Sequence, residues 1–149
     1  MTFLCIASYF KGNRFLEQCK AEGCTVLLLT IEDALTENWA RHACDDVFAV
    51  NNFHDRRKLV NVVAYLMRTR KIDRIVALDD FDVEVAAQLR DHFRMTNVGH
   101  GDSTARFFRD KLAMRTRARE LNKQPCLNNH RRHRHRYGRV ITSLVNDRR

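Results

Sequence analysis

Four short apolar runs lie within the first 78 residues of the chain, and the stretches between them mix apolar and polar residues. Inside each run the apolar residues follow one another, without the every-second-residue alternation of a half-exposed strand. Continuous apolar runs of this length are typical of strands covered on both faces, as in parallel sheets. The predicted strands are residues 3–8, 25–30, 46–50 and 74–78.

Between and after these runs, apolar residues recur three or four positions apart, which predicts amphipathic helices. Gly23 is expected to end the first helix, because glycine readily adopts the left-handed cap conformation. The predicted helices are residues 13–22, a short one begun by Thr36 that aligns Leu35, Trp39 and Ala43, residues 55–70, residues 82–93, one from Asp102 or Ser103 to Arg109, and a last one to about Asn122. Residues 96–98 are a candidate edge strand.

The alternation of strands and helices predicts the α/β class. We expect a Rossmann-like parallel sheet of four to five strands flanked by helices, joined by right-handed crossovers, with a C-terminal helical extension. Ligands of such sheets bind outside the carboxyl ends of the strands. The loops that follow the predicted strands are therefore the places to look for functional residues.

Composition narrows the class of protein. The 149 residues suit one domain, and 44% hydrophobic with 30% charged residues excludes wholesale disorder. No apolar run approaches the ~20 residues of a membrane span, and no N-terminal stretch looks like a signal peptide, so we expect a cytoplasmic protein. The cysteines, at positions 5, 19, 24, 44 and 126, include no CxxC pair. We interpret them as small buried hydrophobic residues rather than as a redox or metal site.

Most of the formal net charge of +9 belongs to the end of the chain. Residues 130–149 contain seven Arg and one Asp, which leaves only +3 for residues 1–129. Arginine can neutralise nucleic-acid phosphates, but Tyr137 is the only aromatic residue of this segment and offers little stacking. A metal site of His130, His133 and His135 is disfavoured, because the interleaved Arg residues would repel a cation. The remaining interpretation is a disordered basic tail.

The loops after the strands lack the usual nucleotide motifs. The loop at residues 8–13 has one Gly and no GxGxxG, and no GxxxxGK[ST] occurs anywhere in the chain. The fourth predicted strand is followed by an acidic cluster, Asp79, Asp80, Asp82 and Glu84. These residues are candidates to line a cleft and to bind a substrate amine or a metal. In the alternative interpretation, Asp82 caps the next helix and the other carboxylates favour its N-terminal dipole.

Three features in residues 79–119 resemble the ATP-grasp family, in its carboxylate–amine ligase or carboxylase-like branch. An acidic and Ala-rich helix begins with residues 82–87. A Gly-containing turn, residues 99–101, precedes a small helix. The run Arg109-Asp110-Lys111 is then followed by Met114 and Arg115. The resemblance covers roughly residues 1–122.

The resemblance implies a domain division. Residues 1–100 would be a pre-ATP-grasp-like α/β domain, residues 101–122 a helical linker at the start of an ATP-grasp region, and residues 123–149 the basic tail. Intact relatives use ATP and Mg²⁺ to join a small-molecule carboxylate or amino acid to an amine through an acyl-phosphate. Carried over from the family, Lys111 would bind ATP, as an ammonium suits phosphate. Asp110 is expected to cap and orient the following helix. The alternative for Lys111 is a solvated lysine at the start of that helix.

The sequence departs from the family after this helix. Residues 121–125 lead directly into the Arg/His-rich segment, and nothing resembles the subdomains that hold the nucleotide and Mg²⁺. We therefore assign no catalytic and no metal-binding residue, and we expect a truncated or frameshifted chain that is inactive alone. Self-association into a homo-oligomer is a further expectation from the family. The alternative function is a small α/β module that binds nucleic acid or an acidic partner through its tail.

Overall fold

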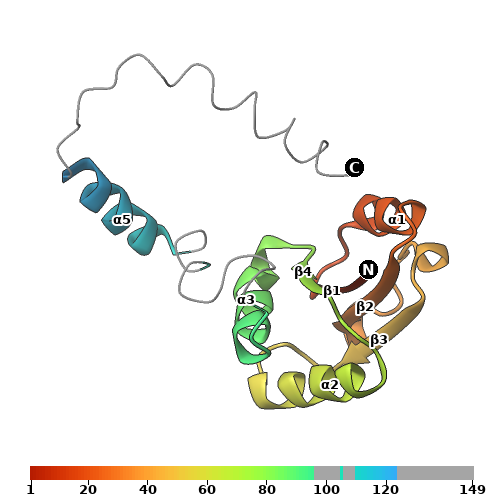
Figure 1. The fold of residues 1–149 in the computed structure, drawn as a ribbon. Helices are drawn as coiled ribbons and strands as arrows, with labels where there is room; N and C mark the ends of the chain where they lie inside the picture. Colours follow the sequence, from red (N-terminus) through yellow and green to blue (C-terminus); the bar gives the residue numbers. More distant parts are fainter. Residues whose placement is uncertain (96–104, 106–109, 124–149) are drawn as a thin grey trace, which may run out of the picture. The chain divides into compact units, whose positions relative to one another are not determined.

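The computed structural model describes residues 1–95, 105 and 110–123. Its centre is a four-stranded parallel sheet of β1 (Thr2–Ala7), β2 (Thr25–Ile31), β3 (Asp46–Val50) and β4 (Arg74–Ala77), in the order β3-β2-β1-β4 (Figure 1). The helices packed against it are α1 (Asn13–Ala21), α2 (Arg56–Thr69) and α3 (Val83–His92). The predicted α/β class with a parallel sheet is confirmed.

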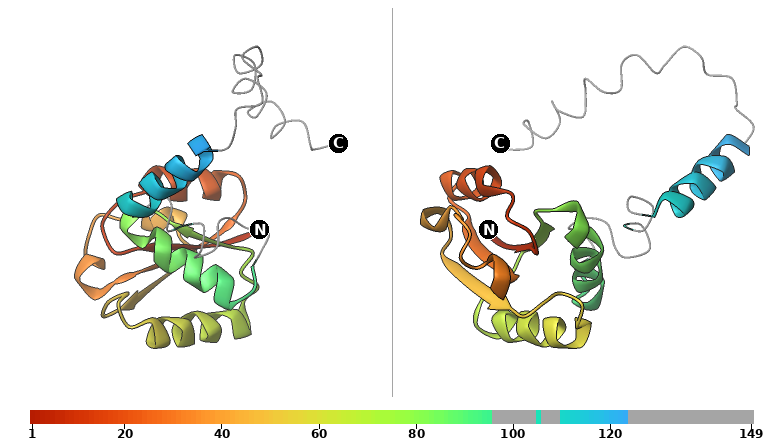
Figure 2. Two further views of the ribbon diagram at one scale, coloured as in Figure 1. Left: turned by 90° about the vertical axis from the view of Figure 1, so that its left-hand side faces the viewer. Right: turned by 180° about the vertical axis from the view of Figure 1, so that it is seen from behind.

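The two faces of the sheet are covered by different helices. The even-numbered residues of β1, Leu4 and Ile6, belong to a buried cluster with residues of α2 and α3. The odd-numbered Cys5 and Ala7 belong to a second cluster, with residues of α1 and of the segment after β2. Figure 2 shows α1 on one side of the sheet and α2 with α3 on the other. Burial of both faces explains why the strands are continuous apolar runs.

The described cysteines belong to the core. Cys5 and Cys19 are buried, Cys24 and Cys44 are half-buried, and all four are free thiols. Burial raises the pKa of the Cys5 thiol well above its ordinary value. Such a thiol stays protonated and behaves as a small hydrophobic side chain. Cys126 lies outside the described residues.

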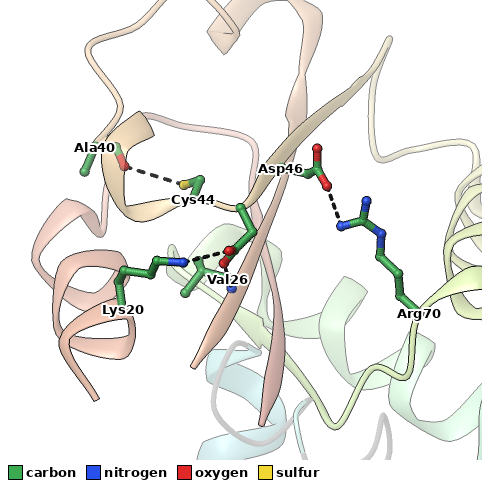
Figure 3. Close-up of polar contacts among 7 residues, drawn as sticks. Lys20, Val26, Ala40, Cys44, Asp46 and Arg70 are labelled. Carbon is green, nitrogen blue, oxygen red and sulfur yellow. Dashed lines mark hydrogen bonds and ion pairs between the residues drawn. The ribbon is translucent and has the colours of Figure 1, made fainter. Parts of the chain in front are cut away.

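Ion pairs and hydrogen bonds hold the amino end of the β2–β3 pair (Figure 3). The Asp45 carboxylate lies 2.6 Å from Lys20 Nζ and accepts a 2.8 Å hydrogen bond from Val26 N. These two contacts keep the pKa of Asp45 below its ordinary value. Next to it, Arg70 pairs with Asp46 across the amino end of β3. The loops at this edge of the sheet are thus occupied with structural contacts.

The prediction of a short helix beginning at Thr36 is wrong. Two single 3₁₀ turns, Glu32–Ala34 and Arg41–Ala43, form instead. Trp39 is drawn into the core, where its Nε1 donates a 2.7 Å hydrogen bond to the Ala34 carbonyl. The Asn13 side chain fixes the same segment by bonding to the main chain of residues 38 and 40. Tertiary anchoring outweighs the weak helical pattern here.

The predicted last helix is present as α5 (Lys111–Lys123). Asp110 Oδ1 accepts hydrogen bonds from Leu112 N at 2.8 Å and Ala113 N at 3.1 Å, so its predicted capping role is confirmed. The expected strand at residues 96–98, the helix begun by Asp102 or Ser103, and the basic tail from residue 124 onward lie outside the described residues. No helix in the described part of the chain is long and apolar enough to cross a membrane.

Candidate ligand-binding cavity

A cavity of about 730 Å³ opens at the carboxyl edge of the sheet. Its lining comes from the segments that follow all four strands, represented by Ser8 after β1, Ala34 after β2, Asn52 after β3 and Asp82 after β4. This is the location in which open parallel sheets bind their ligands. We call it the carboxyl-edge cavity.

Asp82 joins the loops after β1 and β4. Its carboxylate accepts hydrogen bonds from Ser8 N at 2.7 Å and from Ser8 Oγ at 2.8 Å. Asp82 occupies the N-cap position of α3, but its side chain makes no capping hydrogen bond, so the predicted capping role is wrong. The carboxylate turns toward Ser8 because β1 and β4 are neighbours in the sheet. A residue 74 positions away in sequence thereby fixes the first loop.

Asp79 makes a second connection between the same two loops. One carboxylate oxygen lies 2.7 Å from Lys11 Nζ, and the other accepts a 2.9 Å hydrogen bond from Phe81 N. Burial is the largest single influence and would raise the pKa of Asp79. The contacts with Lys11 and Phe81 N, together with a hydrogen bond to Asp80, outweigh it and hold that pKa below its ordinary value. The same ion pair raises the pKa of Lys11. Asp79 is therefore a buried structural anion.

The four predicted cleft residues separate into two pairs. Asp82 and Glu84 line the carboxyl-edge cavity, Asp82 as a buried residue and Glu84 as a half-buried one in the first turn of α3. Asp79 and Asp80 are not among the described residues that line it. Of the four acidic residues, only Asp82 and Glu84 therefore belong to the cavity lining, while Asp79 helps to fix the loop after β4.

Aromatic side chains at the cavity were missed by the sequence analysis. Tyr9 and Phe81, from the β1 and β4 loops, pack with ring centroids 5.3 Å apart. Phe10 packs edge to face on Trp39 at 5.1 Å. Tyr9, Phe10 and Phe81 all line the cavity, although each is at least 40% exposed. The adjacent Tyr9 and Phe10, placed directly after a predicted strand, were the available signal.

Solved structures share this fold. An L-amino acid ligase from Bacillus licheniformis matches with a TM-score of 0.67 at 16% identity, covering 82% of this chain and 30% of that one. A phosphoribosylglycinamide synthetase from Anaerococcus prevotii matches with a TM-score of 0.61 at 15% identity, over 81% and 29%. The biotin carboxylase domain of a Hydrogenobacter thermophilus 2-oxoglutarate carboxylase, in complex with MgADP and bicarbonate, matches with a TM-score of 0.55 at 13% identity, over 80% and 27%.

The chain shares its fold with a part of each of these enzymes. It spans about 30% of the length of the amino acid ligase. No family model matches the sequence, and no curated protein does so either. At these sequence identities the similarity extends to the fold alone. Any ligand has to be inferred from the side chains of this chain.

The described lining of the carboxyl-edge cavity does not fit a polyphosphate. Four carboxylates, those of Asp33, Glu37, Asp82 and Glu84, share the cavity with one guanidinium and one imidazole. Like charges at this density repel an anion. Among the described residues, no group of three or more His, Cys, Asp or Glu could hold a metal ion. The charge of the described lining therefore does not suit the phosphates of ATP.

Lys111, the residue predicted for ATP, is the first residue of α5 and is exposed. Residues 96–104 and 106–109, which precede it, lie outside the described part of the chain. Within α5 the backbone around Lys111 is organised by the Asp110 cap. The nucleotide-binding role of Lys111 remains a prediction.

Proposed function

We propose that this chain is the N-terminal part of an ATP-grasp enzyme that joins a carboxylate to an amine, and that its own contribution is to bind a small-molecule substrate. The observation that carries the proposal is the carboxyl-edge cavity, formed by the segments after all four strands. An amino acid ligase and a phosphoribosylglycinamide synthetase, both ATP-grasp enzymes, share the fold that surrounds it. The features of residues 79–119 that resemble the ATP-grasp family support the same function.

The nucleotide would belong to a different part of such an enzyme. In the proposed function, Lys111 contacts ATP from the start of α5, and the acidic cavity is left to the substrate. Phosphoryl transfer needs several positioned cations and donors around the phosphates. We therefore propose that the 149-residue chain alone turns over no ATP. A cytoplasmic location and self-association complete the proposal.

Saturation-transfer NMR on the purified chain tests the substrate role. We expect magnetisation from the cavity side chains to reach at least one of three substrate classes, which are amino acids, organic amines and small carboxylates. We expect it to reach MgATP weakly through Lys111. Lys111→Ala should abolish the ATP signal and leave the amino-acid signal unchanged. Lys71→Ala is the matched control, because Lys71 is also an exposed lysine and lies outside the cavity lining.

Two results would contradict the proposal. The absence of transfer to every amino acid, organic amine and small carboxylate tried would remove the substrate role. Mg²⁺-dependent phosphate release from ATP by the wild-type chain, lost in Lys111→Ala, would show that the chain alone is an active enzyme.

A further inference from the structure

We infer that the carboxyl-edge cavity takes an organic amine with a flat, apolar body, rather than a carboxylate or a phosphate. The inference rests on the proposed function in one respect, that the cavity is a substrate site. It adds that the cavity binds the amine substrate of the ligation reaction rather than the carboxylate substrate.

Three carboxylates reach the cavity from two separate elements. Asp33 and Glu37 come from the segment after β2, and Glu84 comes from the first turn of α3. Within residues 1–95, the side chains of these three residues form neither an ion pair nor a hydrogen bond with a described neighbour. Asp79 and Asp82, in contrast, are used for structural contacts. The acidic charge of the three is thus available to a ligand.

Aromatic rings lie against the same cavity. Tyr9, Phe10 and Phe81 line it and are 58%, 40% and 56% exposed. Exposed rings of this kind give a flat ligand an apolar surface, and their faces attract a cation. Carboxylates together with aromatic faces favour a protonated amine over a metal ion, because a bare cation would not use the apolar surface.

Arg56, the first residue of α2, is the only Lys or Arg among the described residues that line the cavity. His54, from the segment after β3, also lines it. With four carboxylates in the lining, the cavity is formally negative even though the chain as a whole carries +9. An anion would be attracted by the protein at large and repelled by the cavity, so the cavity itself selects for positive charge.

Three probes with the same ring and two-carbon spacer test the charge preference: phenethylamine, phenylalanine and 3-phenylpropionate. NMR titration of the full chain should show the amine binding tightest, with shifts at Tyr9 and Phe81 and weakening as salt increases. Glu37→Gln and Glu84→Gln should each weaken amine binding about two- to fivefold, the range for one partly exposed charge pair. Glu32→Gln is the matched control, since Glu32 is exposed beside Asp33 but does not line the cavity.

The outcomes separate this inference from the proposed function. If 3-phenylpropionate binds at Tyr9 and Phe81 as tightly as the amine, the charge preference is overturned and the substrate role stands. Equal weakening by the Glu32 control would also overturn it. If no probe shifts the cavity residues, both the inference and the cavity's role as a substrate site are lost.

Discussion

At the scale of single residues, two buried carboxylates connect the loops that line the cavity. Asp82 is 2% exposed and accepts two hydrogen bonds from Ser8, while Asp79 is 4% exposed and pairs with Lys11. A buried acid is costly unless it is bonded in this way. Both residues join the β1 and β4 loops, so the shape of the cavity depends on these contacts.

Asp82→Ala should lower the free energy of unfolding by about 2–4 kcal/mol, because the Ser8 donors lose a charged acceptor. Ser8→Ala removes only the hydroxyl bond and should cost about 1–2 kcal/mol. Urea denaturation followed by circular dichroism measures both. Asp33→Ala, at an exposed carboxylate of the same cavity, is the control and should stay within about 0.5 kcal/mol of wild type. Equal effects of the three substitutions would contradict a structural role for Asp82.

The Asp79–Lys11 pair predicts a pH dependence. Folding lowers the pKa of Asp79 from its ordinary 3.8, so the unfolded chain binds the proton more tightly than the folded one. The resulting stability is present above pH 3.8 and is lost as the pH falls through the folded pKa. Lys11→Met should therefore destabilise the protein at about pH 6 and much less at about pH 2.

Urea denaturation of wild type and Lys11→Met at the two pH values measures this difference. Arg14→Met, which also removes an exposed cation near the start of α1, is the control and should show the same small change at both pH values. A Lys11→Met effect that does not shrink in acid would contradict the ion-pair explanation.

At the scale of elements, Gly12 determines the backbone conformation where the β1 loop enters α1. It is the N-cap residue of α1 and has φ +90°, in the left-handed region that favours glycine. A Cβ at this position would lie 3.0 Å from Leu78 Cβ, in the segment after β4. Glycine at this position lets the β1 loop approach the β4 loop without displacing Leu78. The contacts that Asp79 and Asp82 make with the β1 loop are favoured by that approach.

Gly12→Ala should cost about 2–4 kcal/mol, from backbone strain together with the clash at Leu78. Gly23→Ala is the matched comparison, because Gly23 also has a positive φ, of +73°, but a Cβ there meets nothing within 4 Å. It should cost only the backbone strain, about 1–2 kcal/mol. Thermal or urea unfolding of the two variants tests the ranking, and equal losses would rule out a packing role for Gly12.

At the scale of the whole molecule, positive and negative charges are concentrated in different parts of the chain. Residues 130–149 carry a formal +6, while the carboxyl-edge cavity in the α/β domain is lined by four acids. The basic isoelectric point of the chain therefore describes its tail rather than its cavity. Any affinity for nucleic acid and any affinity for a small amine should belong to different segments.

Deletion of residues 130–149 tests this separation. Filter binding to nucleic acid by the full chain should weaken steeply as salt increases and should vanish in the deletion variant. Phenethylamine binding should persist in that variant, because none of the cavity residues is removed. Nucleic-acid binding that survives the deletion would place the interaction in the α/β domain and contradict the assignment to the tail.

The sequence by itself determined the elements, because their signals are local. The apolar runs specified the four strands, and the helical spacing of Leu59, Val63 and Leu66 specified α2. Asp110 was correctly predicted as a cap, since its hydrogen-bond partners lie two and three residues away. The parallel sheet also implied that the loops after the strands would meet at one edge.

Only the tertiary structure decided what the loop residues do. The strand order β3-β2-β1-β4 places Ser8 beside Asp82, and this contact across 74 positions changes a predicted helix cap into a connection between loops. Burial of Trp39 replaced a predicted helix with two 3₁₀ turns. A free-energy gain from a distant partner leaves no periodic signal in the sequence. Asp82 and Glu84 were expected at a cleft, but the contribution of Asp33, Glu37 and the aromatic residues emerged only when the strands were assembled.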